Sequence, residues 1–359
     1  GLRTPSGLEL RTGGEKEPAW IYRRVDCSHP PAYNNFMNIL FLTRKFPGMV
    51  GGLSRFITYL KAGFPPLNLH KRVDLIHVTD ASLLLPGCFL KFLLAKPMTL
   101  TAHGLDITWN NSLYQLILRT CFRFADAVIV DSPATRKLLE RRPYLRSHVY
   151  TILPGIAIKH FMNKEQVPTL PPLQGKTVLL TIGNLVSRKG IARFVARVIP
   201  KLPDHVVYLV VGDGPERSSI RSAATKHGVD NRVFDLGNLP DAQIAHLLAR
   251  VAHIYVAPNV HISHNFEGFG IAAGEAAAMG LPVLASRVDG LPSIIHHTKN
   301  GLLVSPTPTA WVNAILSMES PKVRAKMGRR ARQYTKSHFS WKKTTAQYVR
   351  FFQEVGDKG

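Results

Sequence analysis

The chain has 359 residues, a hydrophobic content of 45% and a formal net charge of +23 at pH 7. A chain of this length usually forms more than one hydrophobic core, so two domains of ordinary size are expected. No apolar run reaches the roughly 18 residues that a membrane-spanning helix needs, because Pro86 and Lys91 interrupt the best candidate, residues 82–95, for which we predict a buried helix.

The positive charge lies in the body of the chain rather than in its N-terminal segment. Residues 1–36 hold five Lys/Arg against four Asp/Glu, whereas residues 320–350 contain ten Lys/Arg and no acidic residue. A second basic cluster covers residues 136–146. Such surfaces attract polyanions, which include nucleic acid, anionic lipid and phosphorylated substrates. The alternative is a surface that only keeps the protein in solution.

Three scattered cysteines, Cys27, Cys88 and Cys121, show neither metal-ligand spacing nor an even count for a disulfide framework. A reducing compartment is therefore expected, and we predict a cytoplasmic protein. Residues 1–36 lack the apolar core of a secretory signal, and their turn-forming residues predict a disordered leader or a segment foreign to the native chain.

The first half of the chain alternates apolar strands with helices. We predict the strands at residues 38–46, 73–80, 96–106 and 126–132. We predict helices after a glycine-rich turn within residues 47–60, and at residues 112–125 and 132–142. Ser132 would cap the last of these helices, with Pro133 in its first position. Strands that alternate with helices are typical of a parallel, doubly wound sheet.

Residues 159–175 contain three prolines and no clear period, which predicts a linker. The alternation then restarts, with strands predicted at residues 177–183, 206–214, 231–237, 253–259, 281–286 and 301–306. Helices are predicted between them at residues 190–202, 216–228, 240–251 and 270–280. An amphipathic helix closes the chain at residues 339–355, where Ser340 is the expected N-cap.

The sequence therefore predicts an α/β protein with two Rossmann-like, doubly wound domains. The first would cover residues 37–158, the second residues 176–338, and a C-terminal helix and tail residues 339–359. The carboxyl ends of both sheets would face a cleft between the domains, where such sheets bind ligands.

Two cations follow the first strand of the second domain. That strand ends at Gly183, and Arg188 and Lys189 stand next to the start of the following helix. A helix N-terminus with two cations is suited to bind a diphosphate. A solvated loop with two ordinary charges is the alternative.

Two glutamates surround a Gly-Phe-Gly turn later in the same domain. Gly268 and Gly270 allow a tight turn that presents backbone N–H groups, and the helix from Ile271 adds a positive dipole end. Glu275, in the first turn or so of that helix, could accept two hydroxyl groups such as those of a ribose, and Glu267 could meet polar groups next to a phosphate. Both glutamates could instead serve only to stabilise the helix.

These stretches resemble a known family. EGFGIAAGEAAAMGLPVLAS, residues 267–286, resembles the E-x7-E signature of retaining glycosyltransferases of family 4, which have the GT-B fold. The family's other motifs have counterparts in the expected order, namely GGLSRF at 51–56, TAHGLD at 101–106, IGNLVSRKGI at 182–191, VVGDGPER at 210–217 and FSWKKT at 339–344. The likeness covers roughly residues 37–355, with the C-terminal helix expected to cross back to the first domain.

The resemblance implies roles for the donor-side residues. Glu275 would hold the ribose hydroxyls of a nucleotide sugar, UDP- or GDP-linked, and Arg188 with Lys189 would neutralise its diphosphate. Glu267 would contact the transferred sugar together with the backbone of the turn residues Gly268, Phe269 and Gly270. No bound cofactor is implied, because the nucleotide sugar is itself a substrate.

It also implies roles for the first domain. His103 would contact the sugar from the facing domain, and Gly51 and Gly52 would let their loop approach the phosphates and the acceptor. Two features depart from the family pattern nearby: residues 61–72 leave no room for the extra strand and helix that usually precede residues 73–80, and LPGIAI stands at residues 153–158 where Pro-Asn-Gly is usual. A reduced first domain is therefore expected, and acceptor recognition follows less directly from the resemblance.

No metal ion is expected at the site. The chain has no Asp-x-Asp motif, and two cations with a helix terminus can offset the charge of a leaving diphosphate. Retention could follow a front-face path in which the leaving phosphate takes the acceptor's proton, with Glu267 as a covalent nucleophile the alternative. His261 and His264 are spaced like a pair of metal ligands, but no further ligand stands near them except Glu267.

The function that the sequence favours is retaining transfer of a hexose-type sugar to a glycan, a lipid-linked acceptor or another hydroxyl acceptor. The basic surface predicts peripheral attachment to the inner face of an anionic membrane. A GT-B epimerase or hydrolase of nucleotide sugars is the closest alternative. A nucleic-acid-binding protein is another, although no recognised nucleic-acid module is present, so nucleic acid is not an expected partner.

Overall fold

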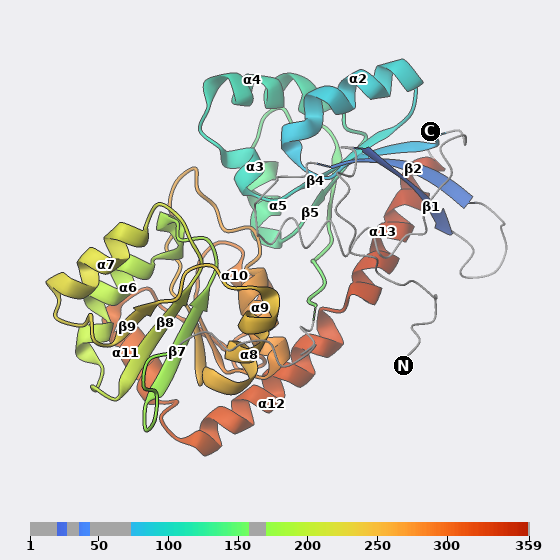
Figure 1. Ribbon diagram of the computed structural model, residues 1–359. Coiled ribbons are helices and arrows are strands. Elements are labelled where there is room, and N and C mark those ends of the chain that lie inside the picture. Colours follow the sequence, from blue (N-terminus) through green and yellow to red (C-terminus); the bar gives the residue numbers. More distant parts are fainter. Residues whose placement is uncertain (1–19, 27–35, 44–72, 158–169, 358–359) are drawn as a thin grey trace.

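The computed structural model contains two parallel α/β units joined by a linker and by a long C-terminal helical segment (Figure 1). The structure describes residues 20–26, 36–43, 73–157 and 170–357. The predicted glycine-rich turn with Gly51 and Gly52, residues 159–169 of the predicted linker, and residues 1–19 all lie outside the described residues.

The first sheet has the strand order β1-β2-β3-β4-β5-β6. β1 pairs antiparallel with β2, and the remaining neighbours pair in parallel. The strands are β1 Trp20–Asp26, β2 Phe36–Leu42, β3 Leu75–Val78, β4 Met98–Ala102, β5 Ala127–Val130 and β6 His148–Thr151. The sequence analysis missed β6, and it placed a segment without secondary structure where β1 lies.

The described residues of this first unit form four α-helices, α2 Leu84–Leu94, α3 Leu105–Thr108, α4 Ser112–Cys121 and α5 Pro133–Glu140. The predicted N-cap of α5 is confirmed, since the Ser132 side chain accepts a hydrogen bond from the Thr135 N–H and Pro133 is at the first helical position. The helix predicted at residues 82–95 is also present as α2, but the prediction that it is buried is wrong, because Phe89 is 67% exposed.

The second sheet is entirely parallel, with the order β12-β11-β10-β7-β8-β9. Its strands are β7 Thr177–Ile182, β8 Val206–Val211, β9 Val233–Asp235, β10 Ile254–Ala257, β11 Val283–Ser286 and β12 Leu302–Val304. The helices of this unit are α6 Ile191–Arg197, α7 Arg217–Lys226, α8 Asp241–His246, α9 Ile271–Met279, α10 Leu291–Ile294, α11 Pro308–Leu316 and α12 Pro321–His338. The predicted α/β class with two doubly wound sheets is thereby confirmed.

The strands of the second sheet are apolar on both faces because helices cover both sides. Alternate residues of β7 point to different cores: Leu180 packs in the cluster that includes α9, whereas Leu179 packs with Phe194 of α6 and Trp311 of α11. The strands therefore read as nearly continuous apolar runs, and their carboxyl ends emerge together at one edge, where the polar loops begin.

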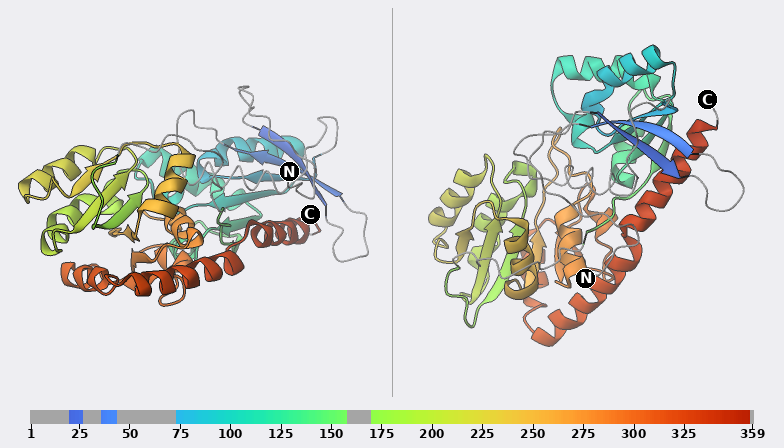
Figure 2. Two further views of the ribbon diagram at one scale, coloured as in Figure 1. Left: turned by 60° about the horizontal axis from the view of Figure 1, so that its bottom comes forward. Right: turned by 45° about the vertical axis from the view of Figure 1, so that its right-hand side comes forward.

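The last helix, α13 Trp341–Gly356, returns to the first unit (Figures 1 and 2). Its Phe351 and Phe352 are buried in one cluster with Ile39 and Leu75 of the first sheet. Ser340 caps it, as expected, by accepting a hydrogen bond from the Lys343 N–H. The C-terminal helix that was predicted to cross back thus covers the face of the first sheet opposite α2 and α4.

Buried polar groups tie α13 to the sheet. The Thr101 hydroxyl lies 3.0 Å from the Tyr348 hydroxyl and 3.1 Å from His77 Nε2, and His77 Nδ1 lies 2.8 Å from the Thr99 hydroxyl. Burial, with a smaller effect of His103, lowers the pKa of His77 to about 3. His77 is therefore a neutral ring that links strands to helix, a structural role.

Among the helices of the described residues, none is long and apolar enough to cross a membrane.

Candidate functional site

A buried carboxylate between two cations marks the edge where the second sheet's strands end. Glu267 Oε2 lies 2.6 Å from Lys189 Nζ and 3.3 Å from Arg188 Nε. The same oxygen accepts a hydrogen bond of 3.0 Å from Asn259 Nδ2. The cations belong to a 3₁₀ turn after β7, and Glu267 belongs to the loop between β10 and α9. β7 and β10 are neighbouring parallel strands, so their loops meet.

The electrostatic balance of this cluster favours anions. Burial disfavours the charge of Glu267, but the charges and hydrogen bonds of Lys189 and Arg188 together lower its pKa below the usual range. Two cations then oppose one carboxylate, all three with side chains no more than 15% exposed. Two cations at a poorly solvated position are suited to bind a diphosphate.

Lys189 also folds back over the end of β7. Gly183 has a φ of 149°, and its missing β-carbon would stand 3.6 Å from Lys189 Cε. The structure therefore brings Gly183, Arg188, Lys189 and Glu267 together, as expected from the sequence. What the sequence did not indicate is that the cations pair directly with Glu267.

The glycine turn after Glu267 is tightly enclosed. Gly270 is the N-cap of α9 with a φ of 87°, a left-handed conformation that favours glycine. Gly268 is confined by space, since a β-carbon there would stand 2.4 Å from the His103 carbonyl oxygen and 2.7 Å from Asp131 Oδ2. Phe269 is buried beside this turn. The loop of the second unit thus touches the first unit.

A second contact between the two units lies next to the first. A β-carbon on Gly104 would stand 2.7 Å from Cδ1 of Phe266. The end of β4, which carries His103 and Gly104, and the loop of residues 266–268 therefore pack directly against each other. This contact places the predicted first-domain histidine beside the predicted donor-side turn.

Glu275 is the fifth residue of α9, which begins at Ile271, so it lies in the second turn rather than the first. Its side chain is almost completely buried. Burial, with smaller effects of Glu275 and Glu267, raises the pKa of Tyr255. Tyr255 donates a hydrogen bond to the Ile182 carbonyl oxygen at the end of β7.

His103 is held by acceptors of its own domain. Its Nε2 lies 3.0 Å from the Thr79 carbonyl oxygen, and its Nδ1 lies 3.5 Å from Asp131 Oδ2. Burial opposes the charge of the ring, but the hydrogen bond and charge of Asp131, followed by Asp106 and Asp80, raise the pKa of His103 to about 9. The ring is therefore a cation at neutral pH.

The site contains four further polar residues, which the sequence analysis did not name. Asn259 binds Glu267, Asn265 accepts from Arg188 Nη1 at 2.9 Å, Asp289 accepts from the Glu267 N–H at 3.3 Å, and Asp131 lies beside His103 and Gly268. Three of them, Asn259, Asp289 and Asp131, lie within three residues after a strand end. That position was the available signal, since it is where open α/β sheets place binding groups.

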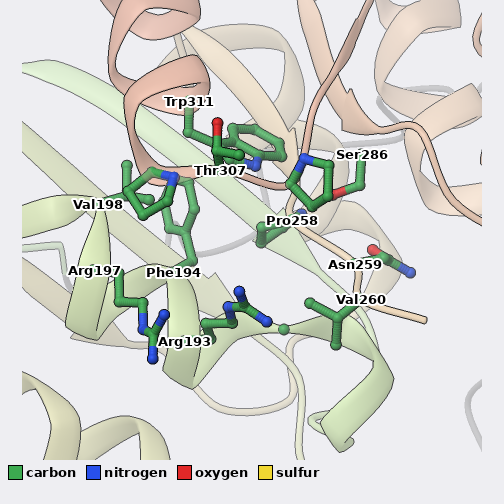
Figure 3. Close-up of a pocket in the computed structure, with 13 residues that line it drawn as sticks. Arg193, Phe194, Arg197, Val198, Pro258, Asn259, Val260, Ser286, Thr307 and Trp311 are labelled. Carbon is green, nitrogen blue, oxygen red and sulfur yellow. The ribbon is translucent and has the colours of Figure 1, made fainter. Parts of the chain in front are cut away.

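An open pocket adjoins the cation turn (Figure 3). Gly190 and Asn259 line it, and both neighbour the cluster of Arg188, Lys189 and Glu267. The rest of the lining comes mainly from α6, from α11 and from the loops after β10 and β12. It includes Phe194 and Trp311, whose ring centroids are 5.3 Å apart. The pocket therefore lies beside the cation turn, against α6 and α11.

The described residues contain no group of three or more His, Cys, Asp or Glu side chains that could hold a metal ion. His261 instead places its Nδ1 2.7 Å from Asp289 Oδ1.

Two family models match the chain on either side of the linker. Residues 163–334 match the model described as glycosyl transferases group 1, and residues 19–160 match glycosyltransferase family 4. Together the two matches extend over most of the chain and meet where the two sheets are joined.

The chain is also similar to curated bacterial proteins. The chain is 31% identical over 194 residues to a D-inositol 3-phosphate glycosyltransferase of Corynebacterium glutamicum, covering 51% of this chain and 44% of that protein. It is 29% identical over 306 residues to an N-acetyl-alpha-D-glucosaminyl L-malate synthase of Bacillus anthracis, covering 79% and 76%. The matches to the first three relatives span 44%, 44% and 65% of those proteins' length.

Solved structures share the architecture. Anabaena HepE in complex with UDP superposes with a TM-score of 0.66 at 20% identity, over 84% of this chain and 82% of that one. Sucrose-phosphate synthase from Thermosynechococcus elongatus superposes with a TM-score of 0.67 at 23% identity, over 89% and 82%. At this level of identity the likeness shows the fold, and it confirms the GT-B arrangement expected from the motifs.

Proposed function

Because the chain belongs to glycosyltransferase family 4, we propose that it moves a hexose-type sugar from a nucleotide-diphosphate donor to a hydroxyl acceptor, with retention of configuration and without a metal ion. The observation that carries this proposal is the buried Glu267 held between Lys189 and Arg188 at the strand ends of the second sheet.

The cation pair would offset the charge that develops on the leaving diphosphate. When the bond between the sugar and the phosphate breaks, negative charge grows on the phosphate oxygen. Arg188 and Lys189 are already ordered by Glu267, so little rearrangement is needed to direct their N–H groups at that oxygen, and preorganised charge of this kind is the main source of many rate enhancements. No metal is needed for this step.

Glu267 is better suited to organise charge than to attack the sugar. Its Oε2 accepts from three donors, and Lys189 and Arg188 lower its pKa, so its basicity and nucleophilicity are reduced. This favours the front-face path over a covalent intermediate. The bond between C1 and the phosphate oxygen breaks, the acceptor oxygen bonds to C1 on the same face, and the acceptor's proton passes to the leaving phosphate oxygen.

The remaining site residues take the roles that the family pattern implies. Glu275 would accept the ribose hydroxyls, and the backbone of Gly268, Phe269 and Gly270 would hold the sugar with Glu267. His103 would contact the sugar from the first domain, as a cation that favours electron-rich oxygens. Gly51 and Gly52 keep their proposed place near the phosphates and acceptor.

Donor and acceptor classes are suggested by the neighbours. HepE structures contain UDP and UDP-glucose, so a UDP-sugar is the first donor to test, with a GDP-sugar second. The curated relatives are named for D-inositol 3-phosphate and L-malate, which supports testing more than one class of hydroxyl acceptor. We propose a glycan or lipid-linked acceptor at an anionic membrane on the cytoplasmic side, since the chain carries a net charge of +23 and such charge attracts anionic lipid.

A calorimetric screen against UDP-, GDP-, ADP- and dTDP-sugars tests the proposal. We expect one nucleotide class to bind, and NMR of the products to show the sugar on an acceptor with its anomeric configuration retained. A product that is an epimer or a free sugar, whether or not acceptor is present, would assign the protein to the epimerase or hydrolase class. Binding of none of the four classes would refute donor recognition.

A further inference from the structure

The first unit exposes an unusual amount of apolar side chain on one helix. Along α2, Leu85, Phe89, Phe92 and Leu93 are 54%, 67%, 63% and 64% exposed. Their spacing of four, three and one residues places them on one side of the helix. Large apolar side chains that gather in this way on a solvent-exposed surface mark an interaction site.

The opposite side of α2 already packs on the sheet. Leu84, Gly87 and Cys88 are buried, and a β-carbon on Gly87 would stand 2.7 Å from Val78 Cγ2 and 2.9 Å from the Met98 sulfur. The helix therefore cannot rotate to bury its outer side without losing this fit. Its outer apolar side is fixed toward the exterior.

The neighbouring helix continues the exposed surface. α4 packs beside α2 (Figure 1). In the 3₁₀ turn that follows α4, the ring of Phe124 lies 5.2 Å from the ring of Phe92 on α2. On α4, Leu113 and Leu116 are 68% and 56% exposed, and they lie three residues apart on one side of the helix. We call the exposed residues Leu85, Phe89, Phe92, Leu93, Leu113 and Leu116 the apolar face.

The charged residues of the segment that carries the apolar face are mostly basic. Residues 81–125 contain four Lys/Arg residues, Lys91, Lys96, Arg119 and Arg123, and a single acidic residue, Asp106, which is buried. Asp126, directly after this segment, is paired with Lys91 at 2.5 Å. Arg123 lies over the Phe124 ring at 5.0 Å. Apolar side chains rimmed by cations fit the boundary between acyl chains and anionic headgroups.

We infer that the apolar face docks the protein on an anionic lipid bilayer, with the apolar side chains at the acyl boundary and the cations among the headgroups. α2 has 11 residues, a length of about 16 Å, which is too short to span a bilayer and suits a helix that lies in the interface. The inference rests on the proposed function, which includes an anionic membrane, and it adds the surface of the protein that contacts the lipid.

A second copy of the chain fits this face less well. In a two-fold dimer the same patch meets itself, so Arg119 and Arg123 of both copies would come together without carboxylates to pair with. Lipid headgroups supply that negative charge. The face also leads toward the proposed site, because Leu105 and Trp109, 41% and 54% exposed, follow His103 by two and six residues.

Co-sedimentation with vesicles tests the inference, using phosphatidylcholine alone and an equimolar mixture with phosphatidylglycerol. We expect the wild type to bind the anionic vesicles and Phe89→Ser/Leu93→Ser to lower the partition coefficient about 100-fold, since two large apolar side chains leave the acyl boundary. Both residues are exposed, so the thermal transition should be unchanged. Val323→Ser, an exposed apolar residue on α12, is the matched control and should bind as wild type.

Charge-only attachment is tested by Arg329→Ala/Arg330→Ala in the basic C-terminal region. If this variant loses binding while Phe89→Ser/Leu93→Ser keeps it, the apolar face is not the docking surface. Sedimentation velocity tests whether a second copy of the chain binds the apolar face instead. The inference is also overturned if the wild type is a dimer, Phe89→Ser/Leu93→Ser is a monomer, and the two bind vesicles equally. A blue shift of Trp109 fluorescence on anionic vesicles, absent in Trp109→Phe, would support it.

Nucleotide binding is measured on the same samples. Phe89→Ser/Leu93→Ser should bind a UDP- or GDP-sugar as the wild type does, because the apolar face lies on the first unit away from Arg188 and Lys189. Vesicle binding without any nucleotide binding would leave the docking surface in place and refute the transferase proposal. Nucleotide binding without vesicle binding would support donor recognition and refute the docking surface.

Discussion

Gly268 lies directly against the backbone of His103, so the donor-side loop meets the first unit at this glycine without room for a side chain. A β-carbon on Gly268 would stand 2.4 Å from the His103 carbonyl oxygen. Backbone atoms cannot move aside as a flexible side chain can. The approach of the two units at the site therefore depends on the absence of a side chain at this position.

Gly268→Ala should prevent this approach. We expect the two units to be held apart by the added methyl group, so that kcat/KM falls about 100-fold because the site is misplaced by an ångström or so. The unfolding temperature should change little, since each unit keeps its own core. Steady-state kinetics and thermal unfolding measure the two effects.

Gly175→Ala is the matched control. A β-carbon at Gly175 meets nothing within 4 Å, although its φ of 72° makes alanine somewhat strained. It should cost about 1 kcal/mol of stability and leave the kinetics unchanged. Wild-type kinetics in Gly268→Ala would show that the close contact is not needed for turnover.

The central part of the site could be predicted from the sequence because it depends on local rules. Arg188 and Lys189 follow one parallel strand, and Glu267 precedes a helix after another, so both had to reach the same sheet edge. Their direct pairing could not be predicted. It depends on which strands are neighbours, and β7 and β10 are adjacent in space but separated by two strands in sequence.

Helix α12 escaped prediction for a different reason. Its buried residues are Gly328, Ala331 and Thr335, none of which is a large apolar residue. A β-carbon on Gly328 would stand 2.0 Å from the Gly280 carbonyl oxygen, so this helix packs by close backbone approach. Such a helix shows no apolar period. The opposite error occurred at α2. Its apolar run predicts a buried helix, but an apolar run alone cannot show which side of the helix is exposed.

Removal of the two cations should abolish donor binding. We expect Arg188→Ala/Lys189→Ala to weaken nucleotide-sugar affinity at least about 100-fold, because a buried diphosphate would lose its charge-assisted hydrogen bonds and Glu267 would be left unpaired beside it. Isothermal titration calorimetry measures the affinity. Arg329→Ala/Arg330→Ala removes an adjacent pair of exposed arginines and should bind the donor as wild type. Equal affinity in both variants would remove the diphosphate assignment.

Glu267→Gln separates charge organisation from anion binding. The amide cannot neutralise Arg188 and Lys189, so the affinity for the product nucleotide UDP or GDP should be retained or increased. Turnover should fall about 100-fold, because the cations are no longer held in one geometry and the sugar loses its carboxylate contact. Glu140→Gln, which changes an exposed pair with Arg136, should alter neither value. Lost nucleotide affinity in Glu267→Gln would indicate that the carboxylate binds the donor more than it orders the cations.

Turnover should not depend on a divalent metal. The leaving diphosphate is proposed to be stabilised by Arg188 and Lys189, and dialysis against EDTA should therefore leave kcat unchanged. The control is a second dialysis against EDTA saturated with Mg²⁺. A loss of activity that added Mg²⁺ restores, but that Na⁺ at equal ionic strength does not, would contradict the metal-free path.

The charge of His103 should make stability depend on pH. Asp131, with Asp106 and Asp80, raises the pKa of His103 in the folded protein to about 9, from 6.5 in the unfolded chain. Because the folded state binds this proton more tightly, the stabilisation is fully present below pH 6.5 and is lost as the pH rises through about 9. Urea unfolding across this window should show a falling free energy of unfolding in the wild type and a smaller slope in His103→Gln. NMR titration of the His103 ring should place its midpoint near pH 9, and Asp131→Asn should lower that midpoint. A midpoint near 6.5 in the wild type, unchanged by Asp131→Asn, would show that the carboxylates do not hold the ring as a cation.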